Sequence, residues 1–519
     1  MYRSEHPDVQ IPDACVYEFV VERFGSYADR AALIDAASGR ALTYAQLIDA
    51  TERVAAALAR RGFSRGDVFA VCSPNVPEYA IVLLAVNRLG GVATTMSPLY
   101  TAHEIARQLR ETRAKCLFTV SGLAARCLEA AQGTQVEEIF ALGDAPGTTA
   151  FEVLMEASRI STLPVARAAD LAALPYSSGT SGVPKGVMLT NRNLVAQLLQ
   201  ADVMLPRRTE DVMLAVLPFF HIYGLMLILL QGLRNGVTLI TMARFEFEPF
   251  LDCVQRYRIN VAPLVPPIVL QLAKHPAVEQ YDLSSLRQIM CGAAPLGEDV
   301  ERECAQRIGC DVMQGFGMTE FAGATLSSAF GRTPEKRGSV GKVWPNMEAR
   351  IVDLDTGNDL GPDARGELWM RGPNVMVGYF ERPDASRDTL TPDGWLRTGD
   401  VAYVDEGGNF FIVDRVKELI KHNAYQIAPA ELEAALLSHP AVADAAVIPA
   451  ADKESGEVPK AFVVLKRPVE LDTILEHVAA QVAPYKKIRH IEVLDAIPKS
   501  PSGKILRRLL VERERAARR

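Results

Sequence analysis

The sequence predicts an α/β protein in which a large N-terminal region of layered α/β sheets is followed by a β-rich subdomain and a small α+β C-terminal domain. Apolar runs such as VFAVCS, CLFTVS, VTLITM and LRQIMCG alternate with Ala- and Leu-rich stretches of helical pattern. This alternation is typical of largely parallel sheets covered by helices. At 519 residues the chain is long enough for about three or four domain-sized units.

The later part of the chain changes in texture twice. A polar, turn-rich passage at residues 353–365 precedes GELWMRG and GNFFIVDR, whose alternating pattern predicts the β-rich subdomain. After Arg415 the pattern predicts a helix from Pro429 to about Ser438, two strands, a second helix and a short strand, IEVLD. We therefore expect a boundary near residues 415–417, dividing the chain into units 1–414 and 415–519.

Composition and charge exclude several classes of protein. Hydrophobic residues at 49% and charged residues at 23% are ordinary globular values and exclude a disordered chain. The formal net charge of -7 offers no general attraction to nucleic acid or to anionic lipid. An anionic ligand must therefore be held by local cationic groups, and we expect no nucleic-acid partner.

Cysteine usage and hydropathy predict a cytoplasmic protein without a membrane span. The eight Cys include no C-x-x-C pair and no His at zinc spacing, so reduced thiols are expected. The N-terminus, MYRSEHPDVQ, has no apolar segment of the kind that directs secretion. The most apolar window, residues 214–233, is interrupted by Pro218, His221 and Gly224, which predicts a buried strand and helix.

The segment YSSGTSGVPKG, from Tyr176 to Gly186, has the composition of a phosphate-binding loop. Small hydroxyl residues and Gly expose backbone N–H groups to an oxyanion, and Lys185 at the far end can reach a phosphate. The flanking runs LAALPY and VMLT predict a strand–loop–strand hairpin. The spacing is not that of a Walker loop. These residues by themselves leave nucleotide binding and a structural turn both open.

Four other segments carry residues suited to chemistry, although each has a structural alternative. LPFFHIYG places His221 and Tyr223 among apolar neighbours, where a core pair is the alternative. QGFGMTE offers Gly, an aromatic ring, a hydroxyl and the Glu320 carboxylate, which suits a hard cation such as magnesium. WLRTGD presents Asp400, which can accept ribose hydroxyls, and PKSPSGK presents Lys504 on a loop that could equally be a solvated end.

These five segments, together with VDRVKELIK, occur in one order in one chain. On them the chain resembles the adenylate-forming superfamily of acyl-CoA synthetases, adenylation domains and luciferases, and most of all the 4-coumarate:CoA ligases, from about Phe24 to Arg508. The resemblance implies an ATP-dependent acid–thiol ligase that forms an acyl-adenylate and pyrophosphate, then acyl-CoA and AMP. It also implies Mg²⁺ and a mobile C-terminal domain.

The resemblance assigns roles residue by residue. The implied ATP and AMP contacts are Ser177, Ser178, Gly179, Thr180, Ser181, Lys185, Gln314, Gly315, Phe316, Thr319, Asp400, Arg415, Gln426 and Lys504. The implied catalytic residues are Lys504 for adenylation, Lys421 for thioester formation, His221, Thr180 and Glu320, with Glu320 also the metal-linked carboxylate. The acyl pocket falls to His221, Tyr223 and Ala293, the CoA contacts to Arg244, Asn423 and Ala424, and the hinge to Lys417.

One departure from the family pattern leaves the thiol acceptor open. His422, Asn423 and Ala424 stand where such ligases usually carry an aromatic residue and a Lys-Gly pair. A carrier protein as acceptor, or luciferase-like chemistry, is therefore an alternative to CoA. A non-catalytic acyl-binding scaffold is disfavoured, because binding alone needs no adenylation lysine such as Lys504.

The acid is also left open by the sequence. HIYG, CGAAPLG and VPPIVL follow the pattern of hydroxycinnamate ligases, which predicts an aromatic acid such as 4-coumarate or cinnamate. The apolar, flexible residues Leu225, Met226 and Leu227 suit an aliphatic chain equally well. Medium-chain fatty acids are therefore the second expectation.

Overall fold

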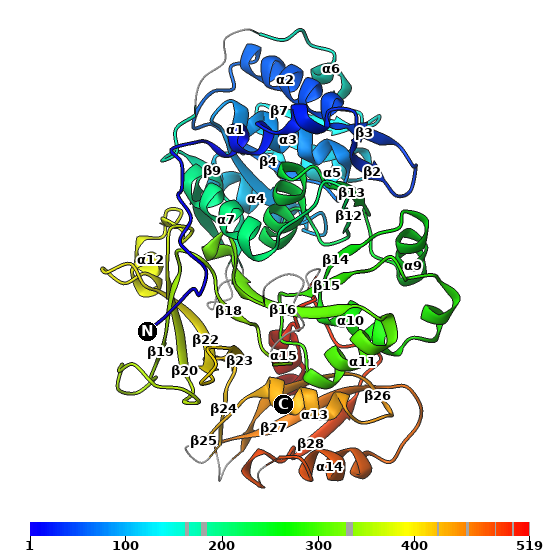
Figure 1. Ribbon diagram of the computed structural model, residues 1–519, viewed down its shortest axis with the longest axis vertical. Helices are drawn as coiled ribbons and strands as arrows, with labels where there is room; N and C mark the ends of the chain where they lie inside the picture. The colour runs from blue at the N-terminus through cyan, green and yellow to red at the C-terminus, as the bar shows by residue number, and fades with distance from the viewer. Residues whose placement is uncertain are drawn as a thin grey trace.

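The structure is a computed structural model that describes residues 1–160, 166–177, 184–328, 336–422, 425–452, 456–482, 484–500 and 503–517. The strands among these residues form four sheets. Helices pack against the two larger sheets, which occupy the N-terminal part, while the C-terminal part lies beside α10 (Pro266–Lys274) and α11 (Glu298–Ile308) (Figure 1). This is the mixed α/β architecture that the sequence predicts.

The first nine-stranded sheet is parallel in its centre, with the order β10-β11-β9-β5-β4-β6-β7-β8, and β21 pairs with β11. Its strands are β4 (Val68–Cys72), β5 (Val92–Met96), β6 (Cys116–Val120), β7 (Glu138–Leu142), β8 (Thr149–Ala150), β9 (Leu171–Ala173), β10 (Tyr176–Ser177), β11 (Lys185–Thr190) and β21 (Gly378–Tyr379). Its helices are α2 (Tyr44–Arg60), α3 (Pro77–Arg88), α4 (Ala102–Thr112), α5 (Ser121–Ala131) and α6 (Glu152–Met155). Strands β10 and β11 pair antiparallel, which confirms the hairpin predicted around the phosphate-loop segment.

The second nine-stranded sheet has the order β18-β17-β16-β15-β14-β12-β13-β2-β3 and is parallel from β16 to β2. Its strands are β2 (Ala31–Asp35), β3 (Ala41–Thr43), β12 (Val212–Ala215), β13 (Thr238–Thr241), β14 (Val261–Leu264), β15 (Gln288–Cys291), β16 (Asp311–Met318), β17 (Gly323–Ser327) and β18 (Lys342–Val343). The helical segments of this part are α1 (Val16–Val21), η1 (Phe24–Tyr27), α7 (Asn191–Met204), η2 (Gly224–Leu230), α8 (Gln231–Arg234), α9 (Phe247–Arg256), α10, η3 (Pro276–Gln280), α11 and η4 (Thr319–Phe321). The central strands are buried along their length, as parallel strands covered on both faces must be.

Two five-stranded sheets complete the fold. The first, β1-β19-β20-β22-β23, is the expected β-rich unit, with strands β1 (Tyr2–Arg3), β19 (Glu348–Val352), β20 (Gly366–Arg371), β22 (Leu396–Val404) and β23 (Phe410–Arg415) and the helix α12 (Pro383–Thr389). The second has the order β25-β24-β27-β26, with β28 paired to β27. It comprises β24 (Ile420–His422), β25 (Tyr425–Ile427), β26 (Val442–Asp452), β27 (Gly456–Leu465) and β28 (His490–Val493), together with α13 (Pro429–Leu437), α14 (Leu471–Ala479), η5 (Pro484–Lys486) and α15 (Arg507–Ala517).

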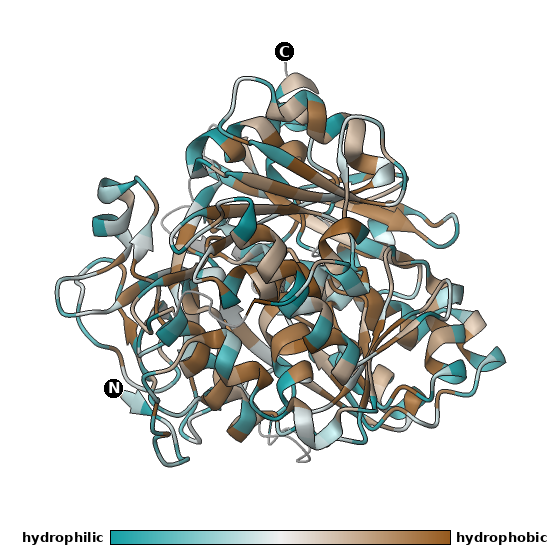
Figure 2. Ribbon diagram, turned by 90° about the horizontal axis from the view of Figure 1, so that it is seen from above, coloured by the Kyte–Doolittle hydropathy of each residue, from teal (hydrophilic) through white to brown (hydrophobic). Residues whose placement is uncertain are grey.

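The C-terminal sheet has a hydrophobic core of its own. Buried residues of β24, α13, β26, β27 and α14 form one cluster, separate from the large cluster of the N-terminal part. Hydrophobic strands lie between helices whose outer faces carry hydrophilic residues (Figure 2). An independent core is what a separately moving unit requires, although the boundary at residues 415–417 stays a prediction.

The apolar window at residues 214–233 lies in the interior of the N-terminal part. It contains the end of β12, the π-helical segment η2 and most of α8, and every residue of η2 is buried. The predicted buried strand is confirmed, whereas the predicted helix is π-helical in its first turns, a form that is often found at functional sites. Across the described ranges, no helix combines the length and the apolarity needed to cross a membrane. All eight Cys are unpaired thiols.

Gly224 is required where the chain enters η2. A Cβ atom built on this residue would lie 2.2 Å from the backbone oxygen of Pro218, a distance that only a backbone shift could relieve. We expect Gly224→Ala to lower the free energy of unfolding by about 2 kcal/mol or more, because overpacking against backbone forces such shifts. Denaturant unfolding would measure the change.

The matched control is Gly122→Ala in α5, where a Cβ atom would meet nothing within 4 Å. This variant should be neutral or more stable by up to about 1 kcal/mol, since Ala is the better helix former. Equal stability of the two variants would contradict the steric argument.

Candidate active site

A cavity opens where the carboxyl ends of several parallel strands meet. The cavity has a volume of about 70 Å³. The side chains that line it follow β12, end β15 or run along β16 and β17, and they are joined by one residue from the C-terminal part, Lys504. In α/β sheets this edge is the usual place for ligands, because neighbouring strands end there together.

His221 and Tyr223 are held by short-range and cross-strand contacts. The Tyr223 hydroxyl donates to the backbone oxygen of Met290 at 3.0 Å, which ties the segment after β12 to β15. His221 Nδ1 accepts from the Tyr223 backbone N–H at 3.4 Å, so the ring proton is on Nε2. Burial and the nearby Lys504 charge lower the pKa of His221 to about 3. The imidazole is therefore neutral and can donate one hydrogen bond into the cavity.

Lys504 reaches the cavity on a tight turn of the C-terminal part. Its backbone N–H donates to Ser500 Oγ at 3.1 Å, and its carbonyl accepts from the Ser500 N–H at 2.8 Å. Gly503 has φ +78°, and a Cβ there would come within 3.2 Å of Val265. Burial and the positive charge of Arg415 lower the pKa of Lys504. This turn therefore brings a cation from the end of the chain to residues more than 200 positions earlier.

Glu320 is held between two hydroxyl groups. The Ser177 hydroxyl donates to Glu320 Oε1 at 2.7 Å, and the Tyr379 hydroxyl donates to the same oxygen at 2.8 Å. Glu320 is buried at the start of η4, directly after β16. The ammonium nitrogen of Lys185 lies 4.8 Å from the centre of the Tyr379 ring. The start of the hairpin loop, its terminal lysine and the buried carboxylate thus form one connected group.

Asp400 and Arg415 face each other across β22 and β23. They are register partners, and Arg415 Nε lies 3.1 Å from Asp400 Oδ1. The second carboxylate oxygen, Oδ2, is buried and has no hydrogen-bond partner among the residues that the structure describes. Burial raises the pKa of Asp400 to about 6, against the opposing effects of Arg415 and Lys504. A buried carboxylate oxygen without a donor is able to accept a hydroxyl of a ligand.

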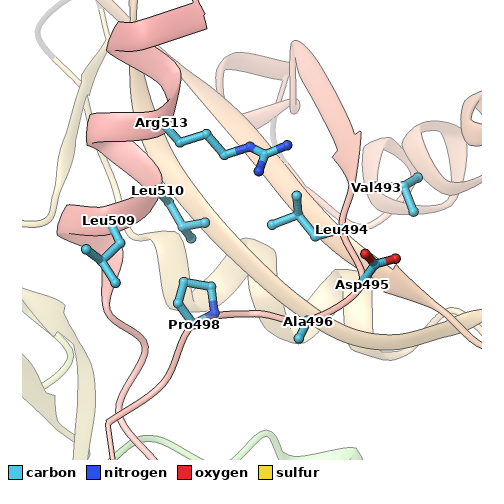
Figure 3. A pocket seen from close by; sticks show the side chains of 8 residues that line it. All are labelled: Val493, Leu494, Asp495, Ala496, Pro498, Leu509, Leu510 and Arg513. Carbon is cyan, nitrogen blue, oxygen red and sulfur yellow. The ribbon is translucent and has the colours of Figure 1, made fainter.

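A second hollow in the C-terminal part lacks this chemistry. It lies between the segment from Val493 to Pro498 and the first turns of α15, and has a volume of about 480 Å³ (Figure 3). Its basic residue, Arg513, is already paired with Glu492, at 2.9 Å from Nε to Oε1. None of the described residues lining it belongs to the set predicted from the sequence. The cavity around Lys504 is therefore the candidate active site.

Comparison with known proteins agrees with this geometry. Residues 21–380 match the AMP-binding enzyme family, and residues 431–504 match the AMP-binding enzyme C-terminal domain. The chain belongs to the AMP-binding enzyme family. The resemblance predicted from the sequence motifs is thereby confirmed.

Relatives of this family match the chain over nearly its whole length. The chain is 42% identical to 4-coumarate–CoA ligase 1 of Petroselinum crispum, covering 98% of this chain and 96% of that protein. It is 43% identical to 4-coumarate–CoA ligase of Pinus taeda, covering 99% and 97%. Among solved structures, an anthranilate CoA ligase in complex with anthranoyl-AMP superposes with a TM-score of 0.91 at 26% identity, covering 98% of each chain. The o-succinylbenzoate CoA synthetase of Bacillus subtilis, solved with its acyl-adenylate, gives 0.83 at 30% identity over 95% of this chain and 97% of its own.

Most of the site residues implied for this AMP-binding enzyme come together in the structure. The cavity is lined by His221, Tyr223, Ala293, Gln314, Gly315, Phe316, Thr319 and Lys504. Ser177 with Glu320 and Asp400 with Arg415 are direct pairs. Each role that the resemblance implies for these residues stays a prediction.

Other implied residues lie elsewhere. Lys421 is exposed, and its backbone N–H donates to Glu457 at 2.8 Å. Arg244 is 84% exposed and lies 3.6 Å from Glu246. Lys417 lies between β23 and β24. The described part of the structure does not include Ser178, Gly179, Thr180, Ser181, Asn423, Ala424 or the side chain of Gln426.

Gln314 has its side chain committed to the protein. Its amide nitrogen donates to Leu296 O at 3.0 Å and to Glu301 at 2.8 Å, and its amide oxygen accepts from the Leu296 N–H at 3.0 Å. These bonds fasten β16 to the CGAAPLG segment. A contact between Gln314 and an adenylate would therefore have to use its backbone.

Met290 and Tyr379 are among the residues of the site that were not found from the sequence. Met290 lines the cavity at the end of β15, and Tyr379 joins Glu320 to Lys185. Met290 lies in an apolar strand, where nothing separates a core residue from a cavity wall. Tyr379 follows a Gly in a segment without a known motif, and it meets Glu320 only through the pairing of β21 with β11.

The raised pKa of Asp400 predicts a pH-dependent stability. Because the folded-state pKa of about 6 lies above the unfolded value, the contribution of Asp400 to stability is greatest below about pH 4 and is lost as the pH rises through 6. From pH 4 to pH 7, we expect the free energy of unfolding of Asp400→Asn to rise by about 2–3 kcal/mol relative to that of the unsubstituted protein. Denaturant unfolding of both proteins across this range would measure the difference.

The exposed residue Asp472 provides a control for the loss of one negative charge. If Asp472→Asn showed the same pH-dependent gain as Asp400→Asn, net charge rather than burial would explain the result.

Proposed function

We propose that the protein is an ATP-dependent carboxylate–CoA ligase that forms an acyl-adenylate and pyrophosphate, and then an acyl-CoA and AMP. The observation that carries the proposal is the position of Lys504 on the cavity that His221 and Phe316 line. The charges of Glu320 and Asp400 both act on this lysine. The names of the 4-coumarate–CoA ligases among its relatives support the same activity.

In the first half-reaction, a carboxylate oxygen of the acid forms a bond to the α-phosphorus of ATP. The bond from this phosphorus to the oxygen that bridges to the β-phosphate breaks, and pyrophosphate leaves. Because both reactants are anions, a preorganised cation stabilises the transition state. Lys504 is positioned to supply it at the cavity, while Lys185 holds the phosphates beside the hairpin loop. Neutral His221 donates from Nε2 to the acid and keeps it in place.

The nucleoside is held by groups on two sheets. Asp400 Oδ2 accepts a ribose hydroxyl, and Arg415 keeps the opposite oxygen of the same carboxylate in place. Phe316 offers a ring face for the adenine, next to Gly315 in β16. Glycine there lets the nucleotide approach the backbone closely. The remaining ATP contacts are proposed for Thr319 and for the loop residues named from the sequence.

The residues at Glu320 fit a magnesium ion. Oε1 accepts two hydrogen bonds, whereas no described residue donates to Oε2. Within the ranges that the structure describes, no three His, Cys, Asp or Glu side chains are grouped to hold a metal. Magnesium usually takes one or two carboxylates and completes its shell with substrate phosphates and water. When bound, it would supply positive charge for the departing pyrophosphate.

The second half-reaction needs a different face of the C-terminal unit. We propose that the C-terminal unit rotates about Lys417, so that Lys504 leaves and Lys421 approaches the adenylate. The exposed position of Lys421 in the present arrangement supports this assignment. Arg244, also exposed, would meet a phosphate of CoA, with Asn423 and Ala424 along the thiol arm. The CoA sulfur then attacks the acyl carbon, and AMP leaves.

For the acid we propose an aromatic substrate of the 4-coumarate or cinnamate type. Phe316 and Tyr223 line the cavity with aromatic rings, and the small residues Gly292, Gly315 and Gly317 leave room for a flat molecule. The oxygen of Tyr223 donates its proton to Met290 O and so can accept a hydrogen bond from a phenolic hydroxyl. The flexible walls Leu227, Met290 and Met313 favour medium-chain fatty acids as a second candidate.

The unpaired state of all eight thiols supports a cytoplasmic location, which we propose along with the activity.

ATP–pyrophosphate exchange with a panel of acids, repeated with CoA and thioester detection, tests the function. We expect exchange and thioester formation with 4-coumarate or cinnamate. Exchange without any thioester would favour a carrier protein as acceptor, and no exchange with any acid would leave only a binding role. A far higher kcat/KM for medium-chain acids than for cinnamates would overturn the aromatic assignment.

The two lysines of the C-terminal unit should separate the half-reactions. We expect Lys504→Ala to lose adenylate formation by about two to three orders of magnitude, because a preorganised cation is removed, and still to convert supplied acyl-adenylate and CoA into thioester. Lys421→Ala should show the opposite bias. Single-turnover kinetics of each half-reaction would measure both.

Lys466→Ala, at an exposed position of the same unit, is the control and should leave both steps unchanged. Equal losses of both half-reactions in the Lys504 and Lys421 variants would favour one fixed active site without domain rotation.

A further inference from the structure

Tyr379 lies between Glu320 and Lys185, two residues of the proposed ATP site. It ends the two-residue strand β21, which pairs antiparallel with β11, and Val187 is its register partner. The Phe380 N–H donates to Gly186 O at 2.8 Å, and the Val377 N–H donates to Met188 O at 3.0 Å. These bonds fix the backbone of Tyr379 beside the strand that begins with Lys185.

The side chain of Tyr379 uses both of its chemical features. It is buried, at 5% exposure, and its hydroxyl donates to Glu320 Oε1 at 2.8 Å. The face of its ring lies 4.8 Å from the Lys185 ammonium, within the range of a cation–π contact. One residue therefore touches both the Glu320 carboxylate and the Lys185 ammonium.

The hydroxyl contact decides how the Glu320 carboxylate is turned. Rotation of a carboxylate about its last bond is soft in the absence of partners. Here Tyr379 and Ser177 both donate to Oε1, and the Glu320 backbone oxygen accepts from the Met376 N–H at 2.8 Å. Two donors on one oxygen leave Oε2 as the oxygen for a cation. Groups that orient a metal ligand in this way commonly change metal affinity 10- to 100-fold when removed.

We propose that Tyr379 is a positioning residue for the ATP-dependent step. Its hydroxyl turns Oε2 of Glu320 toward a divalent cation on the nucleotide, and its ring holds the Lys185 ammonium near the same carboxylate. The inference rests on the proposed function, because it takes ATP with a divalent cation as the ligand. According to this inference, the side chain of Tyr379 sets the distance between the Glu320 carboxylate and the Lys185 ammonium.

Two substitutions separate the two contacts. Tyr379→Phe keeps the ring and removes the hydroxyl, whereas Tyr379→Leu removes both. The probes are Mn²⁺, followed by electron paramagnetic resonance on the full-length protein with ATP and no acid, and ATP itself, titrated calorimetrically in EDTA. We expect Tyr379→Phe to weaken Mn²⁺ binding about tenfold and to leave metal-free ATP affinity within about twofold. Tyr379→Leu should weaken both.

Ser177→Ala removes the other donor to Oε1 and supplies a second route to the same answer. If both hydroxyls act through the orientation of Glu320, Ser177→Ala should also weaken Mn²⁺ binding. In the double variant with Tyr379→Phe, the fold-loss of Mn²⁺ affinity should then differ from the product of the two single fold-losses, because the two hydroxyls share one acceptor. Thermal unfolding of each variant shows whether it is folded, and Ser177→Ala carries the test if Tyr379→Phe is not.

The outcomes distinguish this inference from the function on which it rests. Unchanged Mn²⁺ affinity in Tyr379→Phe, while the unsubstituted protein binds ATP, overturns the positioning role alone. Equal weakening of metal-free and metal-dependent ATP binding in Tyr379→Phe also overturns it, since that pattern indicates general structural damage. Absence of ATP binding by the unsubstituted protein overturns the proposed function instead.

Discussion

The contact of the Lys504 turn with the N-terminal cavity is the interaction on which the arrangement of the site depends. The turn from Ser500 to Lys504 closes by backbone hydrogen bonds, and Gly503 allows it to lie against Val265 at the start of α10. Without this contact the cavity would be a largely apolar pocket with a neutral histidine, because Lys504 is the one cationic residue among the described residues that line it. With it, a half-buried ammonium of lowered pKa meets the residues that follow β12 and β16.

Charges interact across this contact between two parts of the chain that have separate hydrophobic cores. The carboxylates of Glu320 and Asp400 belong to the N-terminal sheets, and both favour the charged form of Lys504, whereas Arg415 opposes it. Because these interactions are spread over several groups, Lys504 can leave without depriving one buried carboxylate of its single partner. In the proposed reaction, Lys504 must leave in this way when the C-terminal unit rotates between the two half-reactions.

The connection between the two units carries contacts of its own. Asp414, the residue before Arg415 in β23, accepts from the Ala430 N–H at 2.9 Å at the start of α13. On the far side of Lys417, Glu418 pairs with Arg507 at 2.8 Å, and Arg507 also holds Glu433 at 2.8 Å. The segment proposed as the hinge therefore lies between one contact that joins the N-terminal part to α13 and one that ties it to α15. A rotation about Lys417 would keep the second contact and change the first.

The sequence by itself determined much of the local structure, and its motifs predicted eight of the residues that line the cavity. Apolar runs predict β4, β6, β13 and β15, and a helical pattern predicts α13, to within a few residues, because strands buried on both faces and helices each have a local sequence pattern. The hairpin around the phosphate-loop segment and the burial of residues 214–233 follow from turn and breaker residues in the same way. The sequence motifs also identify His221, Glu320, Asp400 and Lys504 together as candidate site residues.

The tertiary structure alone decided how these residues are partnered. The Tyr379 hydroxyl donates to Glu320, which is 59 positions earlier in the chain. The Gln314 side-chain amide is hydrogen-bonded to Leu296 and Glu301. Both contacts form because the sheet order brings those elements together. The shifted pKa values of Asp400 and His221 follow from burial that no local pattern encodes. Local periodicity fixes which face of a strand a residue occupies, but side-chain partners and desolvation depend on which strands become neighbours, and that is a property of the whole chain.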